Sequence, residues 1–166
     1  MTEKPLVRRA THDDMPALDA IYAHYVATTG VTFDVEPWPA GKRSAWLAER
    51  EASGDVVLAA EVSGRAAGFA WTSPFRPKAA YGTTAELSVY LAHEACGRGL
   101  GTLLMGALVA ELPRMGKRLA VGGVALPNPA SRALLVRHGF RSVGVLHEVG
   151  FKLDRFWDVE WFERQV

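Results

Sequence analysis

Three glycines, Gly97, Gly99 and Gly101, alternate with other residues just ahead of an apolar pattern with helical spacing. The first amides of a helix have no partner inside the helix, and the helix dipole places partial positive charge beside them. Glycine lets an anion reach these amides because it carries no Cβ. The spacing therefore predicts a phosphate or pyrophosphate cradle built from backbone N–H groups, with Arg98 as a neighbouring cation.

Two common phosphate-binding motifs do not fit this loop. The dinucleotide fingerprint Gly-x-Gly-x-x-Gly needs a glycine where the chain has Thr102, and the P-loop needs a Gly-Lys-Ser/Thr that does not follow. A glycine-rich turn before a buried helix remains an alternative interpretation of the loop.

A carboxylate lies upstream of the glycines. Residues 83–91 alternate between polar and apolar side chains, which is typical of a half-buried strand, and Glu86 is on the polar side. Burial can raise the pKa of a carboxylate toward neutral pH and make it a proton acceptor. Alternation alone favours the simpler alternative, a solvated carboxylate on an exposed strand face.

The elements that position these residues can be predicted from periodicity, caps and turn residues. Thr11 is a candidate cap for a first helix that Gly30 ends, and Ser63-Gly64-Arg65 joins two strands as a hairpin. The expected strands are residues 6–10, 56–62, 66–72, 83–91, 119–126, 140–149 and 151–162, and the later helices are residues 39–52, 103–112 and 128–137.

Length and composition limit the class of protein. A chain of 166 residues with 49% apolar and 22% charged residues is typical of one globular domain, residues 1–166. A net charge of +1 suggests neither nucleic acid nor a membrane surface as partner. The single cysteine, Cys96, excludes an internal disulfide, and the five histidines lack metal-ligand spacing, so we expect no metal. No secretory or membrane-spanning segment is evident, and we expect a cytoplasmic protein.

Several stretches, taken together, resemble the GCN5-related N-acetyltransferase (GNAT) superfamily, and within it the phosphinothricin and methionine-sulfone acetyltransferases. They are the loop Cys-Gly-Arg-Gly-Leu-Gly at 96–101, Val-Thr-Phe-Asp-Val-Glu-Pro at 31–37, Thr-Ala-Glu-Leu-Ser-Val-Tyr at 84–90, Leu-Pro-Asn-Pro-Ala-Ser at 126–131 and residues 150–159. Cys96 replaces a usual Gln or Arg, Asp154 a Gly and Phe156 a Trp. The resemblance implies the GNAT fold, an α/β (α+β) class with a central mixed, mostly antiparallel sheet of about seven strands and about four helices.

The resemblance also implies an activity: transfer of the acetyl group of acetyl-CoA to the primary amine of a small acceptor such as phosphinothricin, methionine sulfone or methionine sulfoximine. Glu86 would be the general base, directly or through one water. The backbone of Val89 and Leu91 would pair with the pantetheine amides. The remaining coenzyme contacts would be the amides of the loop together with Asn128 and Ser131: Arg98, Gly99, Gly101, Thr102, Asn128, Ser131.

The family's candidate acid for the departing thiolate falls at Leu135, which cannot donate a proton. Either the thiolate leaves unaided or another group serves, and Tyr90 is a nearby candidate. No histidine constellation is evident around Cys96, so we expect an inert loop thiol.

Substrate and partner contacts are less specific in the sequence. By position in the family pattern, Arg76, Lys78, Tyr81 and Phe33 are candidates for binding the acceptor, although Phe33 fits core packing equally well. The aromatic final strand has more apolar surface than one buried face requires, and the resemblance implies a homodimer. Two other functions remain open: acetylation of another amine (a protein N-terminus, a polyamine or an aminoglycoside), or a non-catalytic acyl-CoA-binding module.

Overall fold

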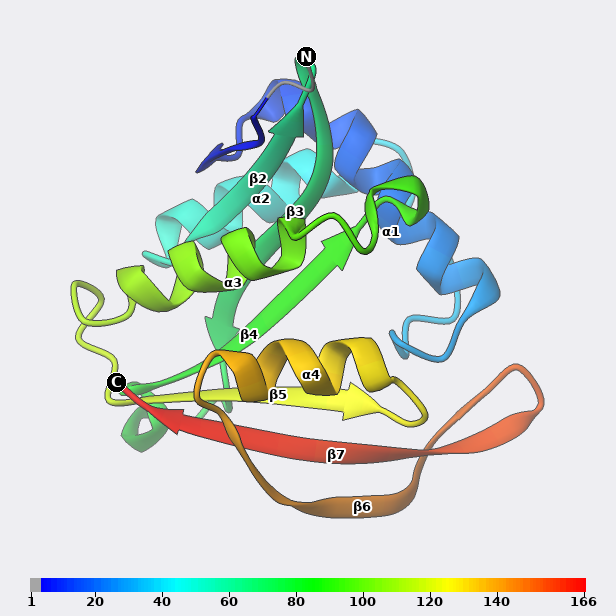
Figure 1. The fold of residues 1–166 in the computed structure, drawn as a ribbon, viewed down its shortest axis with the longest axis vertical. Helices are drawn as coiled ribbons and strands as arrows, with labels where there is room; N and C mark the ends of the chain where they lie inside the picture. Colours follow the sequence, from blue (N-terminus) through cyan, green and yellow to red (C-terminus); the bar gives the residue numbers. More distant parts are fainter. Residues whose placement is uncertain (1–3) are drawn as a thin grey trace.

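One seven-stranded sheet with helices on both faces makes up the computed structural model, which describes residues 4–166 (Figure 1). The spatial strand order is β1-β2-β3-β4-β5-β7-β6, and every pairing is antiparallel except β4 with β5. The strands are β1 (Leu6–Arg9), β2 (Val57–Val62), β3 (Arg65–Pro74), β4 (Thr84–Leu91), β5 (Leu119–Ala125), β6 (Arg141–Lys152) and β7 (Arg155–Gln165). The helices are α1 (Met15–Thr28), α2 (Lys42–Ala52), α3 (Leu100–Glu111) and α4 (Pro129–Arg137). The predicted fold class and element order are confirmed.

Two helix starts lie later in the chain than predicted. Thr11 is a cap, but the capping box it forms with Asp14 opens a short 3₁₀ turn, His12–Asp14, and α1 begins only at Met15. The α2 helix begins at Lys42 rather than at residue 39.

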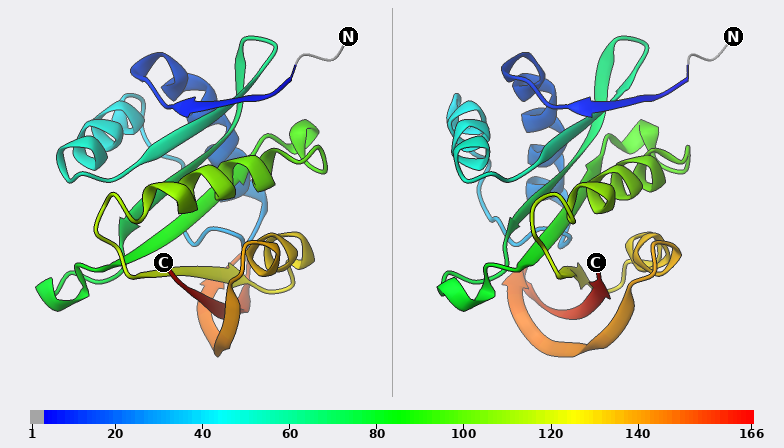
Figure 2. Two further views of the ribbon diagram at one scale, coloured as in Figure 1. Left: turned by 60° about the vertical axis from the view of Figure 1, so that its left-hand side comes forward. Right: turned by 90° about the vertical axis from the view of Figure 1, so that its left-hand side faces the viewer.

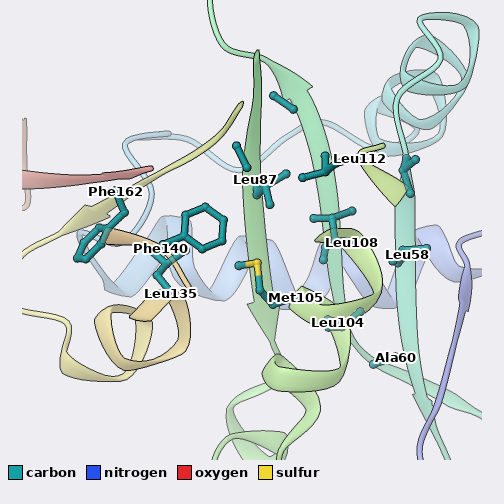
Figure 3. Packing of buried hydrophobic residues seen from close by; sticks show 14 of the residues in the cluster. Leu58, Ala60, Leu87, Leu104, Met105, Leu108, Leu112, Leu135, Phe140 and Phe162 are labelled. Atoms are coloured by element: carbon teal, nitrogen blue, oxygen red, sulfur yellow. The ribbon is translucent and has the colours of Figure 1, made fainter. Parts of the chain in front are cut away.

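Helices cover both faces of the sheet (Figure 2), and each face carries its own hydrophobic core. On one face α3 packs on the central strands through Leu104, Met105 and Leu108, which belong to the same buried cluster as Leu87 of β4 (Figure 3). Burying one such leucine contributes roughly 1.5–3 kcal/mol to stability. On the other face α1 and α2 pack around Phe69 of β3. Successive β4 side chains therefore face different helix layers.

The parallel pairing of β4 with β5 is short. It joins Thr84 to Leu119, Ala85 to Ala120 and Glu86 to Val121 and goes no further. Beyond Glu86, β4 stays with β3 while β5 follows β7, so the two central strands separate (Figure 1). The sheet thus contains a wedge that begins at Glu86.

The C-terminal hairpin turns later than predicted. The expected boundary near Gly150 is wrong, because β6 continues to Lys152 and the turn is made by Leu153 and Asp154, both with positive φ (54° and 56°). Two-residue hairpin turns of this hand match the twist of the strands. Gly150 instead lies inside β6, where the ring of Phe33 covers it so closely that an added Cβ would lie 2.3 Å from a ring carbon. The glycine permits a close approach and does not form the turn.

Candidate active site

A cleft of about 1050 Å³ occupies the wedge between β4 and β5. Its walls come from both helix layers: the loop after α1, the glycine loop before α3, and α4. Among the residues that line it are the following predicted site residues: Phe33, Glu86, Val89, Tyr90, Leu91, Gly99, Gly101, Thr102, Asn128 and Ser131. The cleft therefore passes through the sheet and connects its two faces.

The exposed backbone of β4 forms one edge of the cleft. Ala92 donates its N–H to Ala67 O on β3 (2.8 Å), and by strand alternation Val89 and Leu91 direct their polar backbone groups away from β3, into the wedge. The carbonyl of Leu91 accepts a hydrogen bond from the hydroxyl of Tyr25 (2.7 Å). The geometry is compatible with an extended amide ligand added beside β4, as the sequence predicts.

The glycine loop ends in the start of α3. Gly99 is the N-cap in a left-handed conformation (φ 82°), and the first helical hydrogen bond runs from Leu103 N–H to Gly99 O (3.1 Å). The amides of Gly101 and Thr102 precede that bond and belong to the helix N-terminus, where an anion is favoured. An added Cβ at Gly101 would meet its nearest neighbour at 3.5 Å, an ordinary contact, so packing does not require glycine there. The residues present fit a phosphate-bearing ligand.

Cations are distributed differently from the prediction. Arg98 is exposed and is not among the residues that line the cleft. Arg137 does line the cleft, and within residues 4–166 it is the one lysine or arginine in the lining. It belongs to a face of α4, Ala130, Ala133, Leu134 and Arg137, whose helical spacing could have identified it from the sequence. At the other end of α4, Asn128 accepts the Ser131 N–H (3.0 Å) and leaves its amide N–H₂ available.

Glu86 lies half-buried at the point of the wedge. Burial raises the pKa of Glu86 above its ordinary value, and the nearby cation of Arg76 acts in the opposite direction. A carboxylate with a raised pKa holds a proton more readily at neutral pH, which is what a general base requires.

Two tyrosines that line the cleft have raised pKa values. The ring of Tyr90 is stacked on Trp71, with centroids 5.6 Å apart, and its hydroxyl donates to Val31 O (3.4 Å). Burial raises the pKa of Tyr90 well above its ordinary value, and burial, with the thiol of Cys96 as a second cause, raises the pKa of Tyr25 to about 12. Neither phenol is a strong proton donor at neutral pH.

The loop after α1 forms one wall of the cleft. Asp34 anchors it, since its Oδ2 accepts from the Tyr22 hydroxyl (2.9 Å) and from Trp38 Nε1 (3.1 Å). Phe33 packs on Gly150, and Gly30 packs against the ring of Trp157. Sequence reasoning missed Trp157 and Tyr25 as cleft residues, because their contacts come from segments distant in the chain.

Three predicted acceptor-binding residues lie outside the cleft lining of this chain: Arg76, Lys78 and Tyr81. The guanidinium of Arg76 lies over the ring of Phe75 (4.7 Å) yet is near enough to influence Glu86. The ring of Tyr81 packs edge-on against Phe75 (5.7 Å). A role in acceptor binding for these three residues stays a prediction.

Two other features are absent from residues 4–166. No group of three or more His, Cys, Asp or Glu side chains there could hold a metal ion. No helix in the same range is long and apolar enough to cross a membrane.

Comparison with known proteins gives consistent results. Residues 18–140 match the model of the acetyltransferase (GNAT) family. A phosphinothricin N-acetyltransferase of Streptomyces coelicolor is 40% identical over 99% of this chain and 98% of its own. The fold matches a Sinorhizobium meliloti phosphinothricin acetyltransferase in complex with acetyl-CoA (TM-score 0.94, 28% identity, 98% of this chain and 88% of that one). It also matches a ribosomal-protein-alanine N-acetyltransferase from Brucella melitensis (TM-score 0.95, 35% identity, 97% and 99%).

Proposed function

The chain belongs to the acetyltransferase (GNAT) family and is an acetyl-CoA-dependent N-acetyltransferase, and we propose that it acetylates the primary amine of a small amino-acid-like acceptor with Glu86 as general base. The position of Glu86 is the observation that supports its assignment as the base. Glu86 is half-buried at the point where β4 and β5 separate, and it lines the cleft between them. The similarity to phosphinothricin acetyltransferases supports phosphinothricin, methionine sulfone or methionine sulfoximine as the type of acceptor.

In this proposal the backbone edge of β4 and the amides at the start of α3 hold acetyl-CoA. Glu86 accepts a proton from the acceptor ammonium, directly or through one water, because only the neutral amine can attack. The amine nitrogen forms a bond to the acetyl carbonyl carbon and releases its second proton to water, the carbon–sulfur bond breaks, and coenzyme A departs as the thiolate. Backbone N–H groups that face the wedge stabilise the charge that builds on the carbonyl oxygen.

We propose further that no side chain protonates the thiolate. Leu135 is apolar and packs under β5, where a Cβ on Gly122 would lie 3.3 Å from its Cδ2. The raised pKa of Tyr90 makes its phenol a poor acid, whereas a thiol near pKa ~8.5 is a tolerable leaving group without help. Tyr90→Phe should then keep kcat within about threefold of wild type, and a loss of about a hundredfold, in the range of general acid catalysis, would assign the acid to Tyr90.

The test is release of free thiol from acetyl-CoA with phosphinothricin, methionine sulfone and methionine sulfoximine in parallel. We expect saturable turnover with at least one of them and a loss of roughly 10²–10⁴-fold in kcat for Glu86→Gln. Glu94→Gln is the matched control, because Glu94 is an exposed carboxylate near the coenzyme loop. Binding of acetyl-CoA without turnover on any amine would support a non-catalytic acyl-CoA-binding module instead.

A second acceptor class has specific support. The similarity to a ribosomal-protein-alanine N-acetyltransferase makes a peptide with an N-terminal alanine the competing substrate. Turnover of such a peptide with a higher kcat/KM than the three amino acids would favour it, and polyamines and aminoglycosides complete the panel.

We also propose that the protein is a homodimer and acts in the cytoplasm, where acetyl-CoA is made and used. The β6–β7 hairpin supports the first point, since it exposes several large apolar side chains: Val143, Leu146, Val149, Phe151 and Phe156. Phe156, which is 57% exposed, is the residue to substitute in a test of this interface. Sedimentation should give a dimer for wild type and a monomer for Phe156→Glu, and a wild-type monomer at micromolar concentration would contradict the proposal.

A further inference from the structure

A buried cation lies behind the acceptor side of the cleft. Lys152, the last residue of β6, is 4% exposed. Its Nζ donates to Thr32 O (2.8 Å) and to Tyr25 O (3.4 Å), which are both neutral carbonyls.

Such a cation is unfavourable for the fold by itself. Removing an ammonium from water is costly unless an anion compensates, and a methionine would fill the same volume without that cost. Burial lowers the pKa of Lys152, with the more distant Asp34 opposing the shift. Packing alone therefore does not account for a lysine at this position. Its hydrogen bonds to the carbonyls of Thr32 and Tyr25 do account for it.

Those partners join three parts of the site. Thr32 belongs to the loop that lines the acceptor side, and Tyr25 lies on α1 with its hydroxyl on Leu91 of the coenzyme edge. Trp157 of β7 donates its Nε1–H to Lys152 O (2.8 Å) and packs against Gly30 of the same loop. One ammonium thus ties the loop to the helix and to the C-terminal hairpin.

We propose that Lys152 is a positioning residue that holds the loop of residues 29–34 against the C-terminal hairpin and so forms the acceptor wall of the cleft. The inference rests on the proposed function, because it assigns that wall to the acceptor. Lys152 itself does not line the cleft and acts through Thr32 and Phe33.

Steady-state kinetics with Lys152→Met, Lys152→Gln and Lys152→Arg test the proposal. Lys152→Met should raise KM for the acceptor by about 10- to 100-fold, the range of one charged hydrogen bond, and leave KM for acetyl-CoA within about twofold. Lys152→Gln serves if the methionine variant does not fold, and it should likewise raise KM for the acceptor but not for acetyl-CoA. Lys152→Arg should restore most of the affinity for the acceptor. Lys117→Met is the matched control, because the Lys117 Nζ also donates to a carbonyl, Gly82 O (2.7 Å), on the exposed surface.

Hydrogen exchange separates this proposal from the proposed function. The amides of residues 31–34 should lose protection in Lys152→Met and keep it in the Lys117 control, whichever acceptor the enzyme uses. Unchanged acceptor KM and unchanged exchange in a folded Lys152→Met or Lys152→Gln protein would overturn the proposal. An equal rise in both KM values would also overturn it, since that marks a general structural role. If Lys152→Met loses protection at residues 31–34 while the wild-type enzyme acetylates none of the amino acids, the positioning role of Lys152 stands and the proposed acceptor is refuted.

Discussion

Gly101→Ala should stabilise the protein and weaken its hold on acetyl-CoA. The added Cβ would lie 3.5 Å from Leu134 Cδ2 and 3.7 Å from Leu91 Cδ1, so the free protein can accept it without strain. Alanine is favoured over glycine within a helix by roughly 0.5–1 kcal/mol, which corresponds to a rise in Tm of about 1–4 °C for a chain of this size.

The same methyl group would stand on the cleft wall beside the amides that are expected to hold the pyrophosphate. Loss of one hydrogen bond to a charged group costs about 1.5–3 kcal/mol, so the Kd for acetyl-CoA should rise by roughly 10- to 150-fold. The opposite signs of the two effects make the prediction specific.

Thermal unfolding and calorimetric titration with acetyl-CoA measure both effects, and Gly106→Ala is the control. Gly106 lies in the same helix outside the cleft lining, and its added Cβ would meet His138 Nε2 at 3.6 Å. The control should gain similar stability and bind acetyl-CoA as wild type does. Unchanged affinity in Gly101→Ala would show that the ligand does not approach this turn of α3.

Three further outcomes follow from the contacts described above. Arg76→Ala removes the cation that opposes the rise in the pKa of Glu86, so the acid limb of the kcat/KM profile should move to higher pH; an acid limb that moves to lower pH would contradict the role of Glu86. Tyr25→Phe removes the hydrogen bond to Leu91 O and should lower the free energy of unfolding by about 1 kcal/mol in urea titrations, and no change would mean that water replaces it fully. Asp14 has its pKa lowered by a paired arginine, so its contribution to stability is present above its unfolded pKa of about 3.9 and is lost as pH falls further; Asp14→Asn should flatten the acid end of the stability profile.

The order of elements could be predicted because each one is marked locally. Alternation marks the strand with Glu86, glycine marks the start of α3, and Asn128 marks the start of α4. These signals depend on residues a few positions apart, where propensity and capping act.

The glycine at position 150 shows where local reasoning fails. A glycine between two apolar stretches is a usual turn signal, yet here the turn is made by Leu153 and Asp154. What requires the small residue is the ring of Phe33, from a loop more than a hundred positions earlier. Contacts of that kind are set by the tertiary fold, and one sequence does not display them.

The same limit applies to the candidate site. Glu86 and the glycines could be identified as neighbours in a candidate site because their positions depend on one strand and the loop after it. Arg98 and Arg137 are both arginines near the cradle, and only the packing of α4 beside α3 shows which of the two lines the cleft. Lys152 gave no signal, since a lysine near a strand end is ordinarily exposed.

A cleft that passes through the sheet has two openings, one on each face. Acetyl-CoA would enter on the side of α3 and α4, and the acceptor on the side of the loop after α1, so neither substrate blocks the path of the other. Both can therefore be present at once, and each product can depart by the route through which its precursor came. Double-reciprocal plots at several fixed acceptor concentrations should accordingly intersect, the pattern of a ternary complex, rather than run parallel as they do when an enzyme carries the acyl group between two half-reactions.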